Sequence, residues 1–162
     1  MEKQYRKCAG AVVFNRKGQV FLGNRLGFEN AWQFPQGGVE SGETYIEASK
    51  RELLEETGIK SVIEVYSCDE PIRYEFTDEI KQKLRKRGIL NDGQEISFSL
   101  FYFYGDEKEI NLKTSTQEFF EYKWDSFEFA VTNIVSFKKE AYKQIYEIFL
   151  PIIGQYLAIN SW

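Results

Sequence analysis

A glycine-rich loop that leads directly into a glutamate-rich helix constrains this chain most strongly. It occupies residues 32–59, WQFPQGGVESGETYIEASKRELLEETGI. Pro35 disfavours helix at the residue before it, so the stretch begins extended. Thr44 can cap a helix whose third residue, Glu47, completes a capping box, and Gly58 stands where a helix stop is expected. The sequence therefore predicts a loop, a helix beginning after Thr44, and a second loop.

Three glutamates of this predicted helix, Glu52, Glu55 and Glu56, lie three and four residues apart and project toward one side. Like charges at this spacing cost a few tenths of a kcal/mol per pair, a cost that a bound divalent cation would reverse. Three converging carboxylates form an all-oxygen site that suits magnesium or manganese better than zinc. Taken alone, the same pattern also fits a solvated helix face with Arg51 as an ion-pair partner.

The rest of the chain alternates irregularly between strand and helix patterns, which predicts a mixed sheet with helices packed against it. A turn at residues 15–18 would join the first two strands. Ile46, Leu53 and Leu54 would form the apolar side of the glutamate-rich helix. Further elements are expected as strands over 61–67, 96–105 and 119–124, a surface helix or loop over 78–88, and a C-terminal helix over 137–157, broken near Pro151.

Composition restricts the classes of function. The chain of 162 residues is most simply one domain spanning 1–162, without an apolar run long enough to cross a bilayer and without a recognisable signal peptide. The absence of histidine excludes Ser–His–Asp triads, Cys–His dyads and histidine-ligated zinc. The net charge of −4 argues against nonspecific coating of nucleic acid. Cys8 and Cys68 are expected as reduced thiols of a cytoplasmic protein, and no stable protein partner is evident.

The spacing of the whole stretch resembles the Nudix box at each of its nine defining positions. The box runs over 37–59: Gly37, five residues, Glu43, seven residues, Arg51-Glu52-Leu53, one residue, Glu55-Glu56, one residue, Gly58-Ile59. This resemblance implies an α/β/α sandwich with a central mixed sheet and a loop–helix–loop catalytic motif. It also implies divalent-metal-dependent hydrolysis of a nucleoside diphosphate linked to another group, with Mg²⁺ or Mn²⁺ and two or more ions in the substrate complex.

Within the resemblance, the box residues take distinct expected roles. Glu52, Glu55 and Glu56 would be the main metal ligands, and the Gly37 carbonyl would be a further one because glycine permits close approach. We interpret Glu43 and Arg51 as a structural ion pair that holds the loop on the helix.

The flanks of the box are similar to the Nudix branch that contains bacterial RNA 5′-pyrophosphohydrolases and dinucleoside polyphosphate hydrolases. The similarity lies in the motifs YRKCAGAVVFNRKGQV, LGNRLG, WQFPQGG, IRYEF, DGQ, STQEF and VSFKKEAY. It implies that Arg6, Arg25 and Lys138 bind a 5′ polyphosphate. Glu118 would be a further metal ligand or the general base. The remaining pocket residues carried over are Tyr74 and Phe137, which would sandwich a base, and Gln94, which would hydrogen-bond a base edge or a phosphate.

The substrate is less constrained than the reaction. The main interpretation is removal of pyrophosphate or orthophosphate from tri- or diphosphorylated RNA 5′ ends. The alternatives are asymmetric cleavage of diadenosine polyphosphates such as Ap4A and a noncatalytic binding module. Glu95 and Ile96 follow Gln94, where the branch usually has basic and polar residues, and Gln117 replaces a frequent proline. The basic segment 81–87 bears on the choice of substrate, because an enzyme that acts on RNA can use it to bind the chain, whereas an enzyme that acts on a dinucleotide has little use for it. Such basic runs are also commonly solvated faces.

Overall fold

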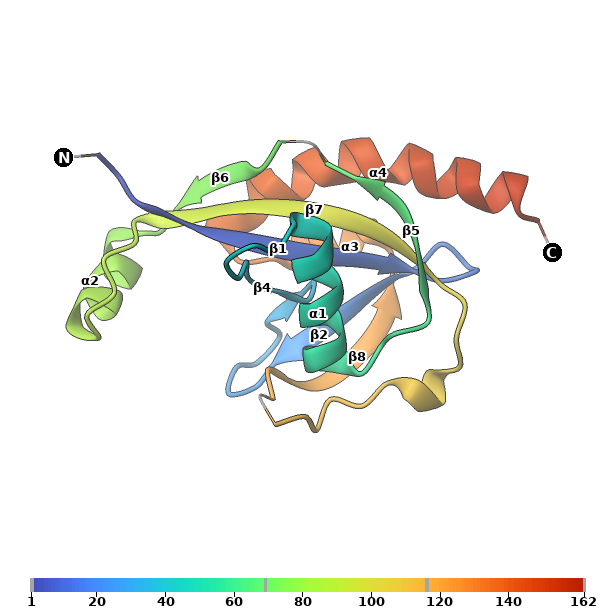
Figure 1. The fold of residues 1–162 in the computed structure, drawn as a ribbon, viewed down its shortest axis with the longest axis horizontal. Helices are drawn as coiled ribbons and strands as arrows, with labels where there is room; N and C mark the ends of the chain where they lie inside the picture. Colours follow the sequence, from blue (N-terminus) through green and yellow to red (C-terminus); the bar gives the residue numbers. More distant parts are fainter. Residues whose placement is uncertain (1, 69, 116, 162) are drawn as a thin grey trace.

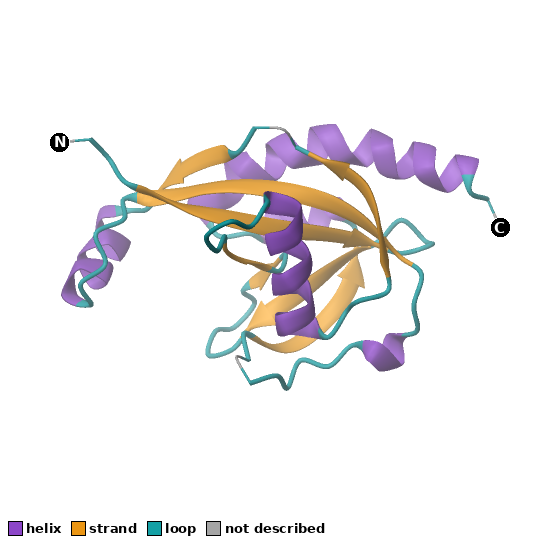
Figure 2. Ribbon diagram, viewed as in Figure 1, coloured by secondary structure: helices purple, strands orange, loops and turns teal. Residues whose placement is uncertain are grey.

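The computed structural model describes residues 2–68, 70–115 and 117–161. Figure 1 and Figure 2 show a strongly twisted sheet with helices on both faces. The strands in these ranges are β1 Tyr5–Phe14, β2 Val20–Arg25, β3 Trp32–Gln33, β4 Gln36–Gly38, β5 Val62–Ser67, β6 Ile72–Glu75, β7 Gly93–Phe103 and β8 Phe119–Asp125. The helices are α1 Tyr45–Thr57, α2 Asp78–Lys86, α3 Phe127–Asn133 and α4 Lys139–Ile159, with short 3₁₀ turns η1 Glu107–Glu109 and η2 Ser136–Lys138.

The sheet is mixed, as the sequence predicts. Its main strand order is β3-β2-β1-β7-β5, while β4 pairs with β1, β6 with β7 and β8 with β2. The central strands β1 and β7 run parallel, in register from Tyr5 opposite Gly93 to Phe14 opposite Tyr102. The neighbouring pairs are antiparallel. This arrangement places the start of β1, the start of β7 and the end of β6 side by side.

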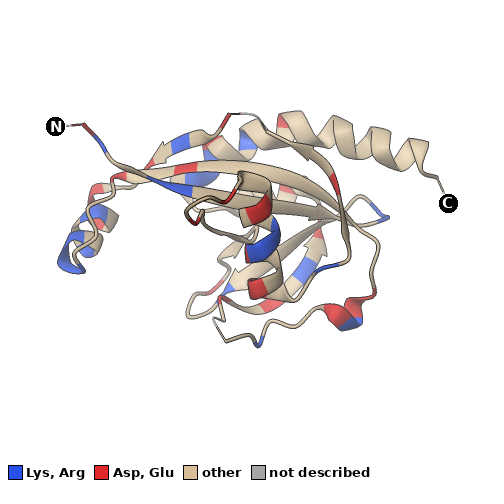
Figure 3. Cartoon of the chain, in the orientation of Figure 1, with Lys and Arg blue, Asp and Glu red and all other residues tan. Residues whose placement is uncertain are grey.

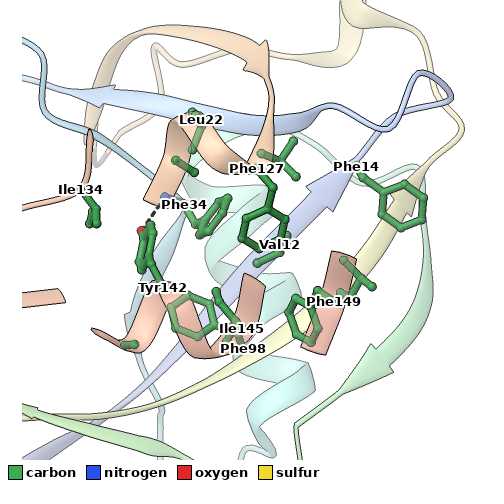
Figure 4. Close-up of a cluster of buried hydrophobic side chains, with 14 of the residues drawn as sticks. Val12, Phe14, Leu22, Phe34, Phe98, Phe127, Ile134, Tyr142, Ile145 and Phe149 are labelled. Carbon is green, nitrogen blue, oxygen red and sulfur yellow. Dashed lines mark hydrogen bonds between the residues drawn. The ribbon is translucent and has the colours of Figure 1, made fainter. Parts of the chain in front are cut away.

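The two faces of β1 feed two separate hydrophobic clusters, because successive side chains of a strand point to opposite faces. Val12 and Phe14 pack in the larger cluster with residues of α3 and α4. Ala11 and Val13 pack in the smaller one with Leu53 of α1. Figure 4 shows the larger cluster, in which the backbone N–H of Phe34 donates a hydrogen bond of 3.0 Å to the buried Tyr142 hydroxyl. The predicted α/β/α sandwich is confirmed.

The capping residues predicted for the glutamate-rich helix are present at both ends of α1. The Thr44 side chain accepts a hydrogen bond of 3.1 Å from the Glu47 N–H, and the Glu47 carboxylate accepts one of 3.0 Å from the Thr44 N–H. Gly58 ends α1 in the left-handed conformation, with φ of 76°. None of the described helices is long and apolar enough to cross a membrane.

Two expectations about the helices need correction, and one helix was not expected. Leu54 is 48% exposed rather than part of the apolar side of α1, because the helix turns its Ala48, Ser49 and Leu53 side inward instead. The C-terminal helix continues through Pro151, which lies on the exposed side, where water can satisfy the carbonyl that proline leaves unpaired. The sequence reading missed α3, although Ser126 caps it through a 3.0 Å hydrogen bond from the Phe129 N–H.

Candidate active site

Arg51 organises the loop that precedes α1. Its Nε and Nη2 donate to the two carboxylate oxygens of Glu43, at 2.7 and 3.0 Å, and Nη2 also donates to the Gly38 carbonyl at 2.8 Å. The hydrogen bonds from Arg51 lower the pKa of Glu43 to about 2, assisted by the Glu40 backbone N–H. The predicted ion pair between Glu43 and Arg51 is therefore present, and it ties the loop to the helix.

The same guanidinium also reaches two of the box glutamates. Arg51 Nη1 lies 2.9 Å from Glu52 Oε1 and 3.2 Å from Glu55 Oε2. Glu52 packs so closely on Gly37 that a Cβ added there would lie 2.1 Å from the Glu52 carboxyl carbon. Burial raises the pKa of Glu52, against the opposing effect of Arg51. A side chain at position 37 would therefore have to displace the Glu52 carboxylate, which lies against the glycine.

Glu56 differs from its neighbours because it is buried. It is 3% exposed, and its Oε2 has no hydrogen-bond partner among the described residues. Burial, together with the charges of Glu52 and Glu118, raises its pKa to about 9, against the opposing effect of a hydrogen bond from the Gln36 backbone. Buried polar atoms are rarely left unpaired, so this oxygen marks a place for a ligand. A divalent cation would supply the missing partner and relieve the repulsion.

The metal cage itself is not preformed. Within residues 2–68, 70–115 and 117–161, no three acidic, cysteine or histidine side chains are arranged to hold an ion. The carboxylates of Glu52, Glu55 and Glu56 were expected to converge on one point. In the structure they do not, because Arg51 binds the carboxylates of Glu52 and Glu55. The donors nevertheless fit magnesium or manganese chemically, since they are carboxylate and carbonyl oxygens around an unpaired buried oxygen. Glu52 and Glu56, with the carbonyl of Gly37 beside Glu52, can supply oxygens of this kind.

Three expected pocket residues lie in one row across neighbouring strands. Arg6 on β1 is opposite Gln94 on β7, which is opposite Tyr74 on β6. The Tyr74 hydroxyl donates to Gln94 Oε1, and Gln36 Nε2 lies 3.3 Å from the same oxygen. Sequence reading assigned Gln36 no role. Gln36 lies two residues before Gly38 in WQFPQGG, on β4, which pairs with β1. Its place in this motif is the sequence signal that could have identified it as a pocket residue.

The two rings expected to sandwich a base contact each other in this structure. The rings of Tyr74 and Phe137 contact each other, with centroids 5.8 Å apart and planes at 47°. Tyr74 is only 9% exposed and belongs to the core cluster, whereas Phe137 is partly buried against it. Burial raises the pKa of Tyr74. Tyr74 reaches the core because β6 pairs with β7 at this point, a tertiary contact that its sequence motif does not encode.

Residues from distant segments complete the site around Glu56. Lys138, in η2, is 7% exposed, and its burial lowers its pKa to about 8, an effect that the charge of Arg25 reinforces. The charges of Cys8, Glu118 and Glu56 act in the opposite direction on the same amine. The Leu26 N–H donates to the Glu118 carbonyl at 2.8 Å, which holds Glu118 beside the end of β2.

An open cleft of about 310 Å³ lies on the α1 side of this cluster, and Arg6, Gly38, Arg51 and Glu52 are among its lining residues. It therefore joins an expected phosphate-binding arginine to an expected metal ligand. Lys7 also lines the cleft and was not singled out from the sequence. A cleft with both carboxylates and guanidinium groups is suited to a polyanion held through cations.

Comparisons with known proteins agree with this geometry. Residues 4–145 match the family model described as NUDIX domain. A Wolbachia pipientis (subsp. Culex pipiens) protein named RNA pyrophosphohydrolase is 39% identical over 153 residues, covering 94% of this chain and 93% of that protein. A Haemophilus influenzae protein of the same name is 38% identical over 152 residues, covering 92% and 76%. A solved C. elegans Ap4A hydrolase shares the fold, with a TM-score of 0.61 and 18% identity over 89% of this chain and 98% of that one.

The family match spans most of the chain and contains the loop, α1 and the residues that surround Glu56. The alignments with the two relatives cover 94% and 92% of this chain. The resemblance inferred from the box spacing is thereby confirmed, and the chain belongs to the Nudix family.

Proposed function

We propose that this protein is a metal-dependent phosphoanhydride hydrolase that converts 5′-triphosphorylated and 5′-diphosphorylated RNA ends to 5′-monophosphates. The observation that carries the proposal is the buried Glu56 carboxylate, whose unpaired oxygen lies among the charges of Glu52, Glu118 and Lys138. Such a site needs a cation and lies beside groups that bind phosphate. The relatives named RNA pyrophosphohydrolase support an RNA end as the substrate.

The proposed cofactor is Mg²⁺ or Mn²⁺, with two or more ions in the substrate complex. When bound, the ions neutralise phosphate charge and lower the pKa of the attacking water. Glu52, Glu55 and Glu56 would hold them together with the Gly37 carbonyl, and Glu118 would be a further ligand or the general base. Glu52 and Glu55 must first exchange their ion pairs with Arg51, at 2.9 and 3.2 Å, for metal coordination. Arg51 would keep its two bonds to Glu43.

Three cations from three segments would bind the 5′ polyphosphate: Arg6 on β1, Arg25 on β2 and Lys138 in η2. Arg6 lines the cleft beside Glu52, and the charge of Arg25 acts on Lys138. With a pKa of about 8, the Lys138 amine is still mostly protonated at neutral pH. A buried ammonium of this kind gains more from a phosphate partner than an exposed one does, because water competes less.

The first base would stack on Phe137 rather than between two rings. The Phe137 ring is partly exposed, and Tyr74 and Phe76 back it at centroid distances of 5.8 and 5.9 Å. An aromatic ring held in place by two neighbouring rings is a suitable surface on which an unpaired base can stack. Gln94, held by the Tyr74 hydroxyl, would then bind a base edge or a phosphate.

A second candidate function is asymmetric cleavage of diadenosine polyphosphates such as Ap4A, because such a substrate also joins a purine to a polyphosphate and could use the same cations and ring. The two candidates separate in one experiment. Products are quantified from matched amounts of triphosphorylated RNA, diphosphorylated RNA and Ap4A, with magnesium and then manganese. We expect a higher kcat/KM on RNA. A higher kcat/KM on Ap4A would reverse the assignment, and Glu52→Gln should abolish turnover without unfolding the protein.

The compartment proposed for this activity is the cytoplasm. Cys8 is a free thiol buried in the larger core cluster. A free cysteine thiol is typical of a reducing compartment, which supports this inference. The proposal is tested by fractionating cells that produce the tagged protein, where recovery with membranes or outside the cell would contradict it.

A further inference from the structure

The helix α2 stands apart from the rest of the fold. It begins after its cap Thr77, three residues beyond Tyr74, and none of its residues is buried. Figure 3 shows it at one end of the sheet, extending away from the main body and rich in basic residues. A helix that contributes so little to the core needs another reason to be ordered where it is.

Two of its basic residues hold α2 in place. Lys81 Nζ lies 2.6 Å from Glu75 Oε2, at the end of β6. Arg85 Nη2 lies 2.7 Å from Asp92 Oδ1, just before β7, and Nη1 donates to the Asn91 carbonyl at 2.9 Å. These contacts fix the helix to the strands that carry Tyr74 and Gln94, so its orientation relative to the site is defined.

The other two basic residues of α2, Lys83 and Lys86, and its C-cap residue Arg87 project without a strong partner. Lys83 has only an exposed contact of 3.6 Å with Glu79. Lys86 and Arg87 are exposed, and their side chains have no ion pair or hydrogen bond among the described residues. Three cations thus gather on a protein whose net charge is −4, nine to thirteen residues from Tyr74 along the chain. We call Lys83, Lys86 and Arg87 the α2 cations.

We propose that the α2 cations bind the phosphates of RNA nucleotides downstream of the 5′ end. This inference rests on the proposed function and adds to it a surface outside the catalytic cleft. A nine-residue helix is about 14 Å long, so it can follow several phosphates of a single strand. Lysine and arginine on such a track supply sequence-independent affinity that depends on salt. A dinucleoside polyphosphate has no downstream nucleotides to place on it, so the surface favours RNA chains.

The test variant replaces all three α2 cations by glutamine, which removes charge and keeps good helix propensity. Substrates are a 5′-triphosphorylated dinucleotide and a longer RNA with the same two first nucleotides. We expect KM for the longer RNA to rise roughly tenfold while kcat and the dinucleotide kinetics stay unchanged. The slope of log affinity against log salt for a 5′-hydroxyl form of the longer RNA should fall by about 2, or 0.7 per lost contact.

A matched control replaces three exposed lysines elsewhere by glutamine, Lys60, Lys108 and Lys113, which alters net charge equally. Circular dichroism and Tm verify that both variants are folded. Equal kinetics and equal salt slopes for the wild type and the α2 variant would overturn the inference, as would an equal loss in the control. An α2 variant that binds RNA normally but loses binding to anionic lipid vesicles would overturn it in favour of a membrane surface.

The two proposals fail separately in this design. If the wild type hydrolyses neither RNA, the proposed function fails. Binding of the 5′-hydroxyl RNA, which needs no turnover, then still decides the role of the α2 cations. If the wild type hydrolyses both RNAs with identical KM, the proposed function stands and the α2 inference fails.

Discussion

The charges along α1 fall into two regions, around Arg51 and around Glu56, which differ in how completely they are paired. Arg51 donates to Glu43, Glu52, Glu55 and the Gly38 carbonyl. Glu56, one helical turn further, is buried with an unpaired oxygen and a pKa of about 9. The region around Arg51 holds the loop on the helix, whereas burial of the unpaired Glu56 carboxyl destabilises the metal-free fold.

Paired and unpaired charges thus lie within thirteen residues of one helix, and the proposed metal ligands come from both regions. A paired region stabilises the fold as it stands, because its charges already have partners. An unpaired region stabilises only a complex, because a bound cation supplies the missing partner. Substitutions in the two regions should therefore have different signatures in activity, stability and pH dependence.

The largest expected effect comes from Glu56→Gln, which removes the unpaired charge. Turnover should fall at least about a hundredfold, because a lost metal ligand costs several kcal/mol of transition-state stabilisation. The metal-free variant should nevertheless melt no lower than the wild type at pH 8, because folding no longer has to protonate a carboxylate whose pKa rises from 4.5 to about 9. Activity assays and melting curves in EDTA check both. A variant with wild-type turnover would remove Glu56 from the site.

Replacing Arg51, which binds all the other groups of the paired region, should mainly lower the free energy of unfolding. Arg51→Met leaves Glu43 and the Gly38 carbonyl without their donor, and we expect a loss of about 2 kcal/mol in the free energy of unfolding. At this chain length, that corresponds to a fall in Tm of about 4–8 °C. Urea titration of the metal-free protein provides the measurement. A Tm equal to that of the wild type would show that the network contributes no net stability.

The free energy of unfolding should depend on pH with opposite signs for Glu43 and for Glu56. Glu43, with its pKa lowered from 4.5 to about 2, stabilises the fold above pH 4.5, and this contribution is lost as pH falls toward 2. Glu56, with its pKa raised to about 9, favours the fold at low pH, and that stability is lost as pH rises from 4.5 through 9. Melting curves of metal-free wild type, Glu43→Gln and Glu56→Gln across pH 3–9 resolve the two. Identical profiles would refute the contrast.

The smallest expected effect is on the exposed side of the same helix. Leu54 is 48% exposed, so Leu54→Ala should change the free energy of unfolding by no more than about 0.5 kcal/mol. Turnover should stay at the wild-type level, because the side chain lies outside both charged regions. Urea unfolding checks the first statement and steady-state kinetics the second. A loss of several kcal/mol would mean that Leu54 is covered in solution.

Much of the fold was predictable because its signals are local. Capping residues, the turn between the first two strands and β-branched runs each act over a few residues, and the structure confirms them. The short strand β6 and the helix α3 were missed, since each depends on packing against neighbours more than on its own pattern. The exposure of Leu54 shows the same limit, because a helix pattern does not fix which side meets the sheet.

The sequence by itself determined the family, the ion pair between Glu43 and Arg51, and the supply of oxygen ligands, because all of these lie within one loop and one helix. Only the tertiary structure decided which glutamate is buried without a partner, that Lys138 lies among the charges of Arg25 and Glu118, and that Tyr74 packs against Phe137. The physical reason is burial: desolvation and contacts between distant segments depend on how the sheet and helices pack, and no spacing along the chain specifies them.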